Sequence, residues 1–319
     1  MSTSSLSCWS RRQELDIAGT TCLWRTVWHM SATPVRTLLH LSDIHILPGD
    51  EDRLHGVDTF QNLLDVFELI EGCKLAIDAI LVSGDLVDRG DAQSYRRLRG
   101  VLDARSKRLG AQVVVAMGNH DTRSTLRQVM LDEPGSDEPV GHVTWIGGLR
   151  LIVLDSSVPG AVYGEVRPDQ LAWLNAELGT PAAEGSVLVM HHAPTLQPGP
   201  LEEVFTLHGA DRFENAIRGT DVVVVLAGHA HHPIASVFAG VLCYAAPAMA
   251  YNVDPLMLPD GVVRGVEGTG FGLVRVVGKR AAATTVALPS AGRETYRTHV
   301  GDDLLRRWLG QEAHAGGRG

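Results

Sequence analysis

Five short polar motifs in this sequence contain the residue types that bind divalent metal ions. In chain order they are Asp43-Ile44-His45, Gly84-Asp85, Gly118-Asn119-His120-Asp121, His191-His192 and Gly228-His229-Ala230-His231. Carboxylate, amide oxygen and imidazole together form a donor set that suits first-row divalent metals. The motifs offer seven such donors: Asp43, His45, Asp85, Asn119, His191, His229 and His231. Seven exceed the four ligands of a tetrahedral zinc site, so the set predicts two adjacent ions that share one carboxylate.

The spacing within two of the motifs favours a shared site. Side chains two residues apart in an extended chain point to the same side, so Asp43 and His45 are expected to face one point. The Gly-His-x-His motif repeats this spacing. His192 directly follows His191 and is expected to point away from it, so it is not counted as a ligand. Each motif alone is compatible with a solvated loop or a turn, but their occurrence after five apolar runs favours a metal site.

Alternating strands and helices are needed to bring these motifs together. Strand-like apolar runs lie at 36–42, 78–83, 112–117, 150–155, 186–191 and 222–227. Helix-like segments lie between them, near 58–71, 91–107, 122–132, 168–178 and 211–218. This alternation predicts an α/β domain, in which ligands gather at the carboxyl ends of the strands.

The last third of the chain has a different pattern. Four strand-like runs follow residue 233 without helices between them, at 235–239, 241–245, 271–277 and 282–288. They predict a more antiparallel region. The segment 250–269 contains several prolines and glycines and predicts a long loop.

Composition and charge exclude several classes of protein. The 319 residues carry a net charge of −9, which disfavours a general nucleic-acid-binding surface. The four cysteines form no Cys-x-x-Cys pair, which argues against a zinc finger and against a disulfide framework. No run of 18 apolar residues and no secretory signal is recognised, so we expect a cytoplasmic protein without a transmembrane segment.

The ordered set D-x-H, G-D, G-N-H-D, H and G-H-x-H resembles the signature of the calcineurin-like metallophosphoesterases, over about residues 36–290. The resemblance implies a four-layer α/β/β/α sandwich with a dinuclear site at the strand carboxyl ends. It implies that one metal is held by Asp43, His45, Asp85 and His231, and the other by Asp85, Asn119, His191 and His229, with Asp85 bridging. It also implies that His120 faces the substrate phosphate as a general acid, and that Asp88 and Asp121 orient the ligands.

Longer stretches narrow the resemblance to one group. Five stretches are similar to class III cyclic nucleotide phosphodiesterases of bacteria: LLHLSDIH, GDLVDRG, VVVAMGNHD, AGHAHH and the block 154–174. This implies hydrolysis of 3′,5′-cyclic nucleotides such as cAMP, by in-line attack of a hydroxide that bridges the two metals. GDLVDRG is also similar to Ser/Thr protein phosphatases, but Ile46 and Asp121 depart from their D-x-H-G and G-N-H-E motifs.

Two other functions stay open at this point. A related group with the same metal motifs hydrolyses glycerophosphodiesters, and a non-catalytic metal-binding scaffold is a hypothesis from another class. The expected cofactors are two ions of Fe, Mn, Zn or Co, with Mn²⁺ expected to activate in vitro. The expected partner is a small phosphodiester rather than a nucleic-acid polymer, and a homodimer is left open.

The expected organisation has three parts. Residues 1–34 show no clear hydrophobic periodicity, which predicts a mobile N-terminal extension. An ordered arm is the alternative, and Met30 is an alternative start of translation. Residues 35–300 form the metallophosphoesterase domain. Residues 301–319 predict a short amphipathic helix at 302–309, followed by a disordered tail.

Overall fold

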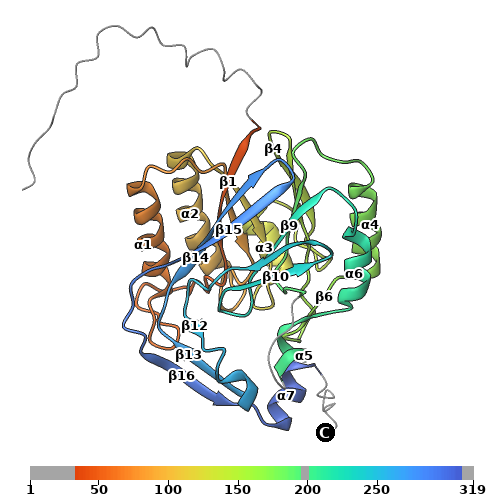
Figure 1. The fold of residues 1–319 in the computed structure, drawn as a ribbon. Coiled ribbons are helices and arrows are strands. Elements are labelled where there is room, and N and C mark those ends of the chain that lie inside the picture. The colour runs from red at the N-terminus through yellow and green to blue at the C-terminus, as the bar shows by residue number, and fades with distance from the viewer. Residues whose placement is uncertain (1–32, 195–200, 311–319) are drawn as a thin grey trace, which may run out of the picture. The chain divides into compact units, whose positions relative to one another are not determined.

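Two β-sheets with facing apolar sides form the centre of the fold (Figure 1). The computed structural model describes residues 33–194 and 201–310. The first sheet has the order β15 (Arg280–Ala287), β14 (Gly270–Val277), β1 (Val35–Leu41), β2 (Ala79–Ser83) and β3 (Gln112–Ala116). The second has the order β10 (Ile234–Phe238), β11 (Val241–Ala245), β9 (Val222–Ala227), β7 (Ser186–Val189), β5 (Leu149–Val153) and β4 (His142–Ile146). The central strands of each sheet run parallel, so their carboxyl ends lie at a common edge.

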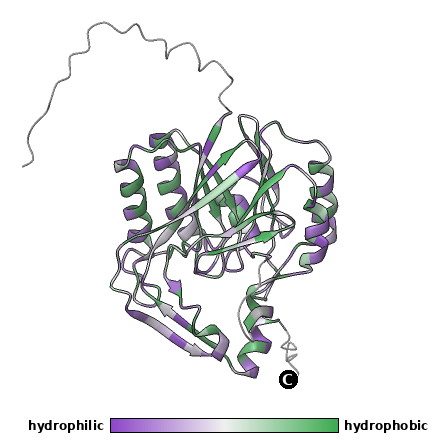
Figure 2. Ribbon diagram, viewed as in Figure 1, coloured by the Kyte–Doolittle hydropathy of each residue, from purple (hydrophilic) through white to green (hydrophobic). Residues whose placement is uncertain are grey.

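Helices cover the outer face of each sheet. The first sheet packs against α1 (Thr59–Gly72), α2 (Ala92–Leu109) and α3 (Arg123–Met130), and the second against α4 (Pro168–Leu178) and α6 (Ala210–Ile217). These helices carry both apolar and hydrophilic residues, as expected for amphipathic helices (Figure 2). The arrangement confirms the predicted four-layer α/β/β/α sandwich.

Strand β1 illustrates how the sequence builds these layers. Its side chains alternate between two apolar clusters. Leu39 and Leu41 pack under the helices, whereas Leu38 packs between the two sheets. All three are fully buried. Where a strand is buried on both faces, apolar residues can occupy consecutive positions, which is why the strand-like runs were recognisable in the sequence.

A smaller third sheet lies at the carboxyl ends of the parallel strands. It consists of β12 (Asn252–Val253), β13 (Val262–Val266) and β16 (Glu294–His299), with the 3₁₀ helix η3 (Leu258–Asp260) before β13. Helix α7 (Asp302–Trp308) follows it, and we call β12, β13, β16 and α7 the cap. Three short elements lie nearby in the fold: helix α5 (Glu202–Phe205) and the paired strands β6 (Gly164–Glu165) and β8 (Leu207–His208). The cap has its own apolar cluster, which includes Tyr251, Val263 and Trp308.

The structure contains the strands and helices expected from the sequence, including β14, β15 and helix α7 in the last third of the chain, but it differs from the expectation in two respects. The predicted long loop at 250–269 is wrong, because β12 and β13 lie within it. Strand β13 pairs with β16, about thirty residues later, and so depends on a partner that a local pattern does not reveal. Strands β4 and β16 were not predicted, since their half-exposed residues lack a clear apolar run.

The chain termini are largely outside this description. The mobile extension expected at 1–34 falls on residues that lie outside the described ones, except for 33 and 34, and the tail expected after residue 310 does so entirely. Among the described residues, no helix is long and apolar enough to cross a membrane.

A buried ion pair fastens the ends of the second sheet that lie opposite the polar motifs. The Arg150 guanidinium donates to both Asp221 carboxylate oxygens at 3.0 and 3.2 Å. Ser186 accepts from Arg150 at 2.8 Å and donates to Asp221 at 2.9 Å. The three residues therefore join β5, β7 and β9 where these strands begin.

This ion pair predicts an asymmetric effect on stability. Asp221→Ala leaves the buried Arg150 guanidinium without its counter-charge and should lower the free energy of unfolding by about 3–5 kcal/mol. The double variant Arg150→Met, Asp221→Leu fills the same space with apolar groups and should lose less than the single variant. Urea unfolding measures both. A double variant as unstable as Asp221→Ala would contradict this role of the pair.

Candidate metal centre

The structure brings the five polar motifs to one end of the two sheets. They follow β1, β2 and β3 of the first sheet, and β7 and β9 of the second. Six of the seven predicted ligands are buried: Asp43, His45, Asp85, His191, His229 and His231. Asn119 is half-buried. Residues nearly two hundred positions apart in the sequence thus share one small space.

The first cluster consists of Asp43, His45, Asp85 and His231, whose donor atoms all lie within 4.8 Å of one another. The Nε2 atoms of His45 and His231 are 3.2 Å apart. Asp43 Oδ1 lies 3.4 Å from His231 Nε2, and Asp85 Oδ2 lies 3.5 Å from His45 Nε2. Four donors converging in this way can surround one ion.

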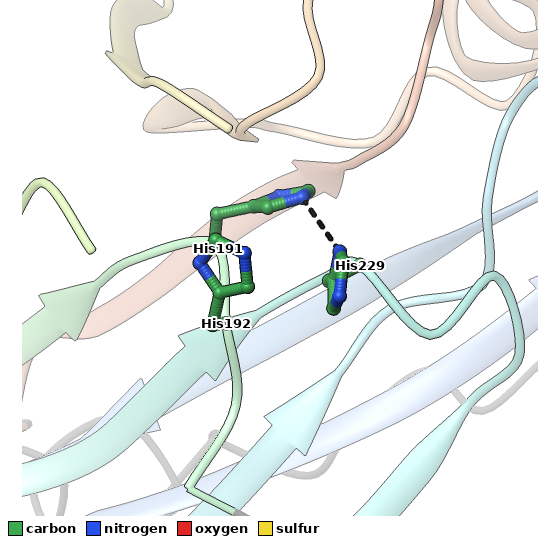
Figure 3. A group of neighbouring side chains, drawn as sticks. All are labelled: His191, His192 and His229. Carbon is green, nitrogen blue, oxygen red and sulfur yellow. Dashed lines mark hydrogen bonds between the residues drawn. The ribbon is translucent and has the colours of Figure 1, made fainter. Parts of the chain in front are cut away.

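The second cluster is formed by His191 and His229 together with Asp85. His229 Nδ1 lies 3.2 Å from His191 Nε2, the contact drawn as a dashed line in Figure 3. Asp85 Oδ2 lies 3.3 Å from His191 Nε2. The same oxygen therefore faces both clusters, which supports Asp85 as the ligand shared by two ions. Asn119 lies beside this cluster and lines the same cavity as Asp85 and His229.

The donor chemistry of the clusters fits two divalent cations. Asn119 Oδ1 is buried and has no hydrogen-bond partner among the described residues, which costs roughly 1–3 kcal/mol unless a further group satisfies it. Burial raises the pKa of Asp43. Burial lowers the pKa of His191, but the carboxylates of Asp85 and Asp43 outweigh this and raise it to about 9. Buried carboxylates beside several imidazoles are a site that needs added positive charge, as metal ions would provide.

An unusual backbone conformation aims most of these ligands. Five of the seven have positive φ angles: Asp43 at 51°, His45 at 49°, Asp85 at 48°, His229 at 71° and His231 at 55°. Residues other than glycine pay about 1–3 kcal/mol for such conformations, which cluster at functional sites. The expectation that Asp43 and His45 lie in an extended chain was therefore wrong. Their side chains do converge, but from a left-handed turn.

Glycines precede several ligands because the chain segments pass very close together. A Cβ atom at Gly118 would overlap Asp85 Oδ1, and one at Gly228 would overlap the Ser42 hydroxyl. Gly118 therefore lets the loop after β3 pass against the proposed bridging carboxylate. The glycines in the sequence motifs are explained by this close approach.

Asp88 and Asp121 make hydrogen bonds to the loops that carry the candidate ligands. Asp88 Oδ1 lies 3.3 Å from His45 Nδ1 and can accept a hydrogen bond from it, which fixes the orientation of the imidazole ring. Asp121 accepts hydrogen bonds from the backbone N–H of Gly118 at 2.8 Å and of Leu86 at 3.2 Å. It thereby ties the loop after β2 to the loop after β3.

Sequence reasoning missed Tyr95, which completes this support. Its hydroxyl donates to Asp121 Oδ1 at 2.8 Å and accepts from the backbone N–H of Thr122 at 3.0 Å. Tyr95 is fully buried. The signal in the sequence was its position on the apolar side of α2, in line with Leu98 and Leu102, where a hydroxyl needs a partner.

His120 lies beside the clusters and faces the cavity. Its Nδ1 donates to the backbone carbonyl of Asp88 at 2.9 Å, and its side chain is 41% exposed. Its ring meets the His45 ring edge-on at 4.6 Å. Burial lowers the pKa of His120, but the charge of Asp85 and the contacts with Asp88 outweigh this and raise it. The Nδ1 contact leaves Nε2 as the nitrogen that can exchange a proton with a bound molecule.

His192 does not point away from its neighbour as the sequence suggested. Its ring lies 4.4 Å from that of His229, measured between centroids, and the three histidines gather as in Figure 3. Both ring nitrogens are nevertheless engaged. Nδ1 lies 2.8 Å from the Ser156 hydroxyl, and Nε2 donates to the Val162 carbonyl at 2.9 Å. These bonds give His192 a supporting place beside the clusters.

A cavity of about 270 Å³ opens above the clusters. Its floor consists of Asp85, Asn119, His120, His229 and His231. Its walls consist of Val162, Phe205, Tyr251, Val253, Val263, Tyr296 and Trp308. The volume lies just below the usual range for small-molecule sites, about 300–1,000 Å³.

Comparison with known proteins identifies the family. Residues 36–233 match the calcineurin-like phosphoesterase family. This chain is a calcineurin-like phosphoesterase. It is 40% identical over 282 residues to a cAMP/cGMP dual specificity phosphodiesterase of Mycobacterium tuberculosis, covering 87% of each chain. It is 38% identical to a protein named as a probable cyclic nucleotide phosphodiesterase of Rhodococcus erythropolis, covering 80% of this chain and 84% of that one.

Solved structures support the same fold for this phosphoesterase. A dimetal phosphatase from Danio rerio superposes with a TM-score of 0.55 at 14% identity, over 79% of this chain and 99% of that one. At this identity the likeness concerns the fold alone. The sandwich is thus shared with a protein of very different sequence.

The close approach at Gly118 gives a test of the bridging carboxylate. In Gly118→Ala the added methyl group would displace Asp85, so the protein should keep fewer than the two ions per chain expected of the wild type. Gly100→Ala is the matched control, because Gly100 lies in α2 with nothing within 4 Å of an added Cβ. It should retain both ions and gain about 0.5–1 kcal/mol of stability. Elemental analysis after Mn²⁺ loading and desalting measures the metal content, and full loading of Gly118→Ala would contradict the assignment.

Proposed function

We propose that this phosphoesterase hydrolyses 3′,5′-cyclic nucleotides, cAMP and cGMP among them, at a centre of two divalent metal ions. The observation that carries the proposal is the position of Asp85 between two donor clusters, with His120 beside them at the floor of a cavity. Identity of 40% along most of the chain to a cAMP/cGMP phosphodiesterase supports the same substrate class.

The chain's own groups have distinct parts in this reaction. When bound, two divalent ions supply Lewis acids that draw charge from a phosphodiester and lower the pKa of water. Asp43, His45 and His231 would hold one ion, and Asn119, His191 and His229 the other, with Asp85 shared between them. The mixed oxygen and nitrogen set accepts Fe, Mn, Zn or Co, and we propose Mn²⁺ as the ion that activates the isolated protein.

His120 is proposed as the general acid. Its Nδ1 proton is held by the Asp88 carbonyl, so the proton that leaves must come from Nε2. Asp85 and Asp88 favour the protonated ring. Opening a 3′,5′-cyclic phosphate releases a ribose alkoxide, a strongly basic group, and a proton from Nε2 would neutralise it as it departs.

The two alternative functions make different demands on the chain. A glycerophosphodiesterase would use the same residues at the cavity floor. Its substrates carry small polar headgroups, however, and these would make few favourable contacts with the apolar and aromatic wall. A non-catalytic scaffold would have no need of His120 at the cavity floor or of all seven ligands. The cyclic nucleotide reading accounts for both features.

A substrate panel tests the proposal. The Mn²⁺-loaded protein should rank 3′,5′-cAMP and 3′,5′-cGMP above 2′,3′-cAMP and glycerophosphocholine in kcat/KM. Verified removal of metal should abolish the activity and lower Tm, and Mn²⁺ should restore both, because it binds the native state. Preference for glycerophosphocholine would replace the proposed substrate, and inactivity on every diester would favour the scaffold.

The role of His120 predicts a dependence on the leaving group. His120→Ala should retain both ions yet lose about 10²–10⁴-fold in kcat with cAMP. The loss should be much smaller with bis(4-nitrophenyl) phosphate, because a nitrophenolate needs little protonation. His299→Ala, at an exposed histidine of β16, is the control and should behave as wild type. Equal losses on both substrates would instead assign His120 to phosphate binding.

A further inference from the structure

The cavity above the metal centre has two unlike sides. Its floor is polar and ionisable, whereas its wall is apolar and aromatic over most of its extent. The wall comes from three separate parts of the chain: the loop at Val162, helix α5 with Phe205, and the cap with Trp308. A ligand that fills this space must therefore combine an anionic end with an apolar or aromatic end.

Two aromatic side chains lead from the floor into the wall. The Phe205 ring lies 5.5 Å from the ring of His229, between centroids, and 6.4 Å from that of Trp308. Both Phe205 and Trp308 are only partly buried, and both line the cavity. Phe205 thus places an apolar ring next to the candidate ligand His229, and Trp308 extends this aromatic lining of the cavity.

Trp308 is held in the wall by a chain of hydrogen bonds that starts at the metal centre. His192, next to the candidate ligand His191, donates from Nε2 to the Val162 carbonyl at 2.9 Å. The Val162 backbone N–H donates in turn to the Trp308 carbonyl at 2.8 Å. The packing of His192 beside His191 and His229 (Figure 3) therefore fixes the first link of this chain.

We propose that Phe205 and Trp308 form the nucleobase subsite of this enzyme, stacking on the base of a nucleotide whose phosphate lies over the metal centre. The inference rests on the proposed function and names how its substrate is recognised. Every base has a flat π-face, and stacking on an aromatic side chain strengthens binding by about 5- to 150-fold. Phe205 and Trp308 offer ring faces and no hydrogen-bonding pattern matched to one base, so adenine and guanine should stack on them alike.

Binding of reaction products tests this without relying on turnover. Isothermal titration of the Mn²⁺-loaded protein compares 5′-AMP with ribose 5-phosphate, which lacks the base. The wild type should bind AMP about 5- to 150-fold more tightly. Trp308→Leu, which keeps apolar bulk but removes the π-face, should reduce this ratio by at least about fivefold, and Trp308→Phe should retain most of it.

Two further variants separate stacking from a loss of structure. Phe205→Leu should reduce the ratio in the same way, at a different place in the fold. Trp145→Ala removes an exposed tryptophan of β4, which does not line the cavity, and should leave the ratio unchanged. Affinity for ribose 5-phosphate should stay near the wild-type value in all four variants, because the phosphate end is not altered.

The outcomes distinguish this inference from the proposed function. If the wild type hydrolyses cAMP but binds AMP and ribose 5-phosphate equally, or if Trp308→Leu and Phe205→Leu keep the full ratio, the subsite is wrong and the function stands. If the ratio falls in both variants although cAMP is not hydrolysed, the subsite stands and the proposed reaction is wrong.

Discussion

The rest of the structure depends on a buried carboxylate that faces two groups of histidines at once. Asp85 Oδ2 lies 3.5 Å from His45 Nε2 and 3.3 Å from His191 Nε2, and these two histidines come from different sheets. The arrangement is costly for a protein without bound cations, because desolvated charges and left-handed backbone conformations accumulate in one place. Unfavourable backbone conformations of this kind cluster at functional sites, which supports a binding role for these residues.

The sandwich is suited to bear this cost. Parallel strands carry the motifs to a common edge, and the apolar clusters between and outside the sheets fix where each strand ends. Asp121 and Tyr95 then tie the loop after β2 to the loop after β3 by hydrogen bonds. The loops are thus over-determined by their surroundings, which lets ligands keep unfavourable φ angles. The apolar packing between the layers stabilises the fold, and the backbone strain is confined to the loops that carry the candidate ligands.

Features of the fold and of the candidate site could be predicted from the sequence where they depend on a local pattern of residues. The polar motifs were recognisable because they combine metal-binding side chains at strand ends, three of them with a glycine that permits close approach, and the buried strands were recognisable as apolar runs. The strands of the cap were not recognisable, because β13 is defined by its pairing with β16, whereas helix α7 of the cap was expected from its amphipathic pattern. The positive φ angles of Asp43 and His45 were not predicted, because the motif follows directly on an apolar run and was interpreted as extended chain. The contacts of His192 with Ser156 and Val162 arise only from the tertiary fold.

The central claim is that two ions lie on either side of Asp85, and anomalous diffraction from crystals of the Mn²⁺-loaded protein tests it most directly. The account predicts two manganese peaks about 3.5–4 Å apart, with the Asp85 carboxylate between them. One peak should be surrounded by Asp43, His45 and His231, and the other by Asn119, His191 and His229. A single ion, or an ion held by the neighbouring group of His45, Asp88 and His120, would contradict the account.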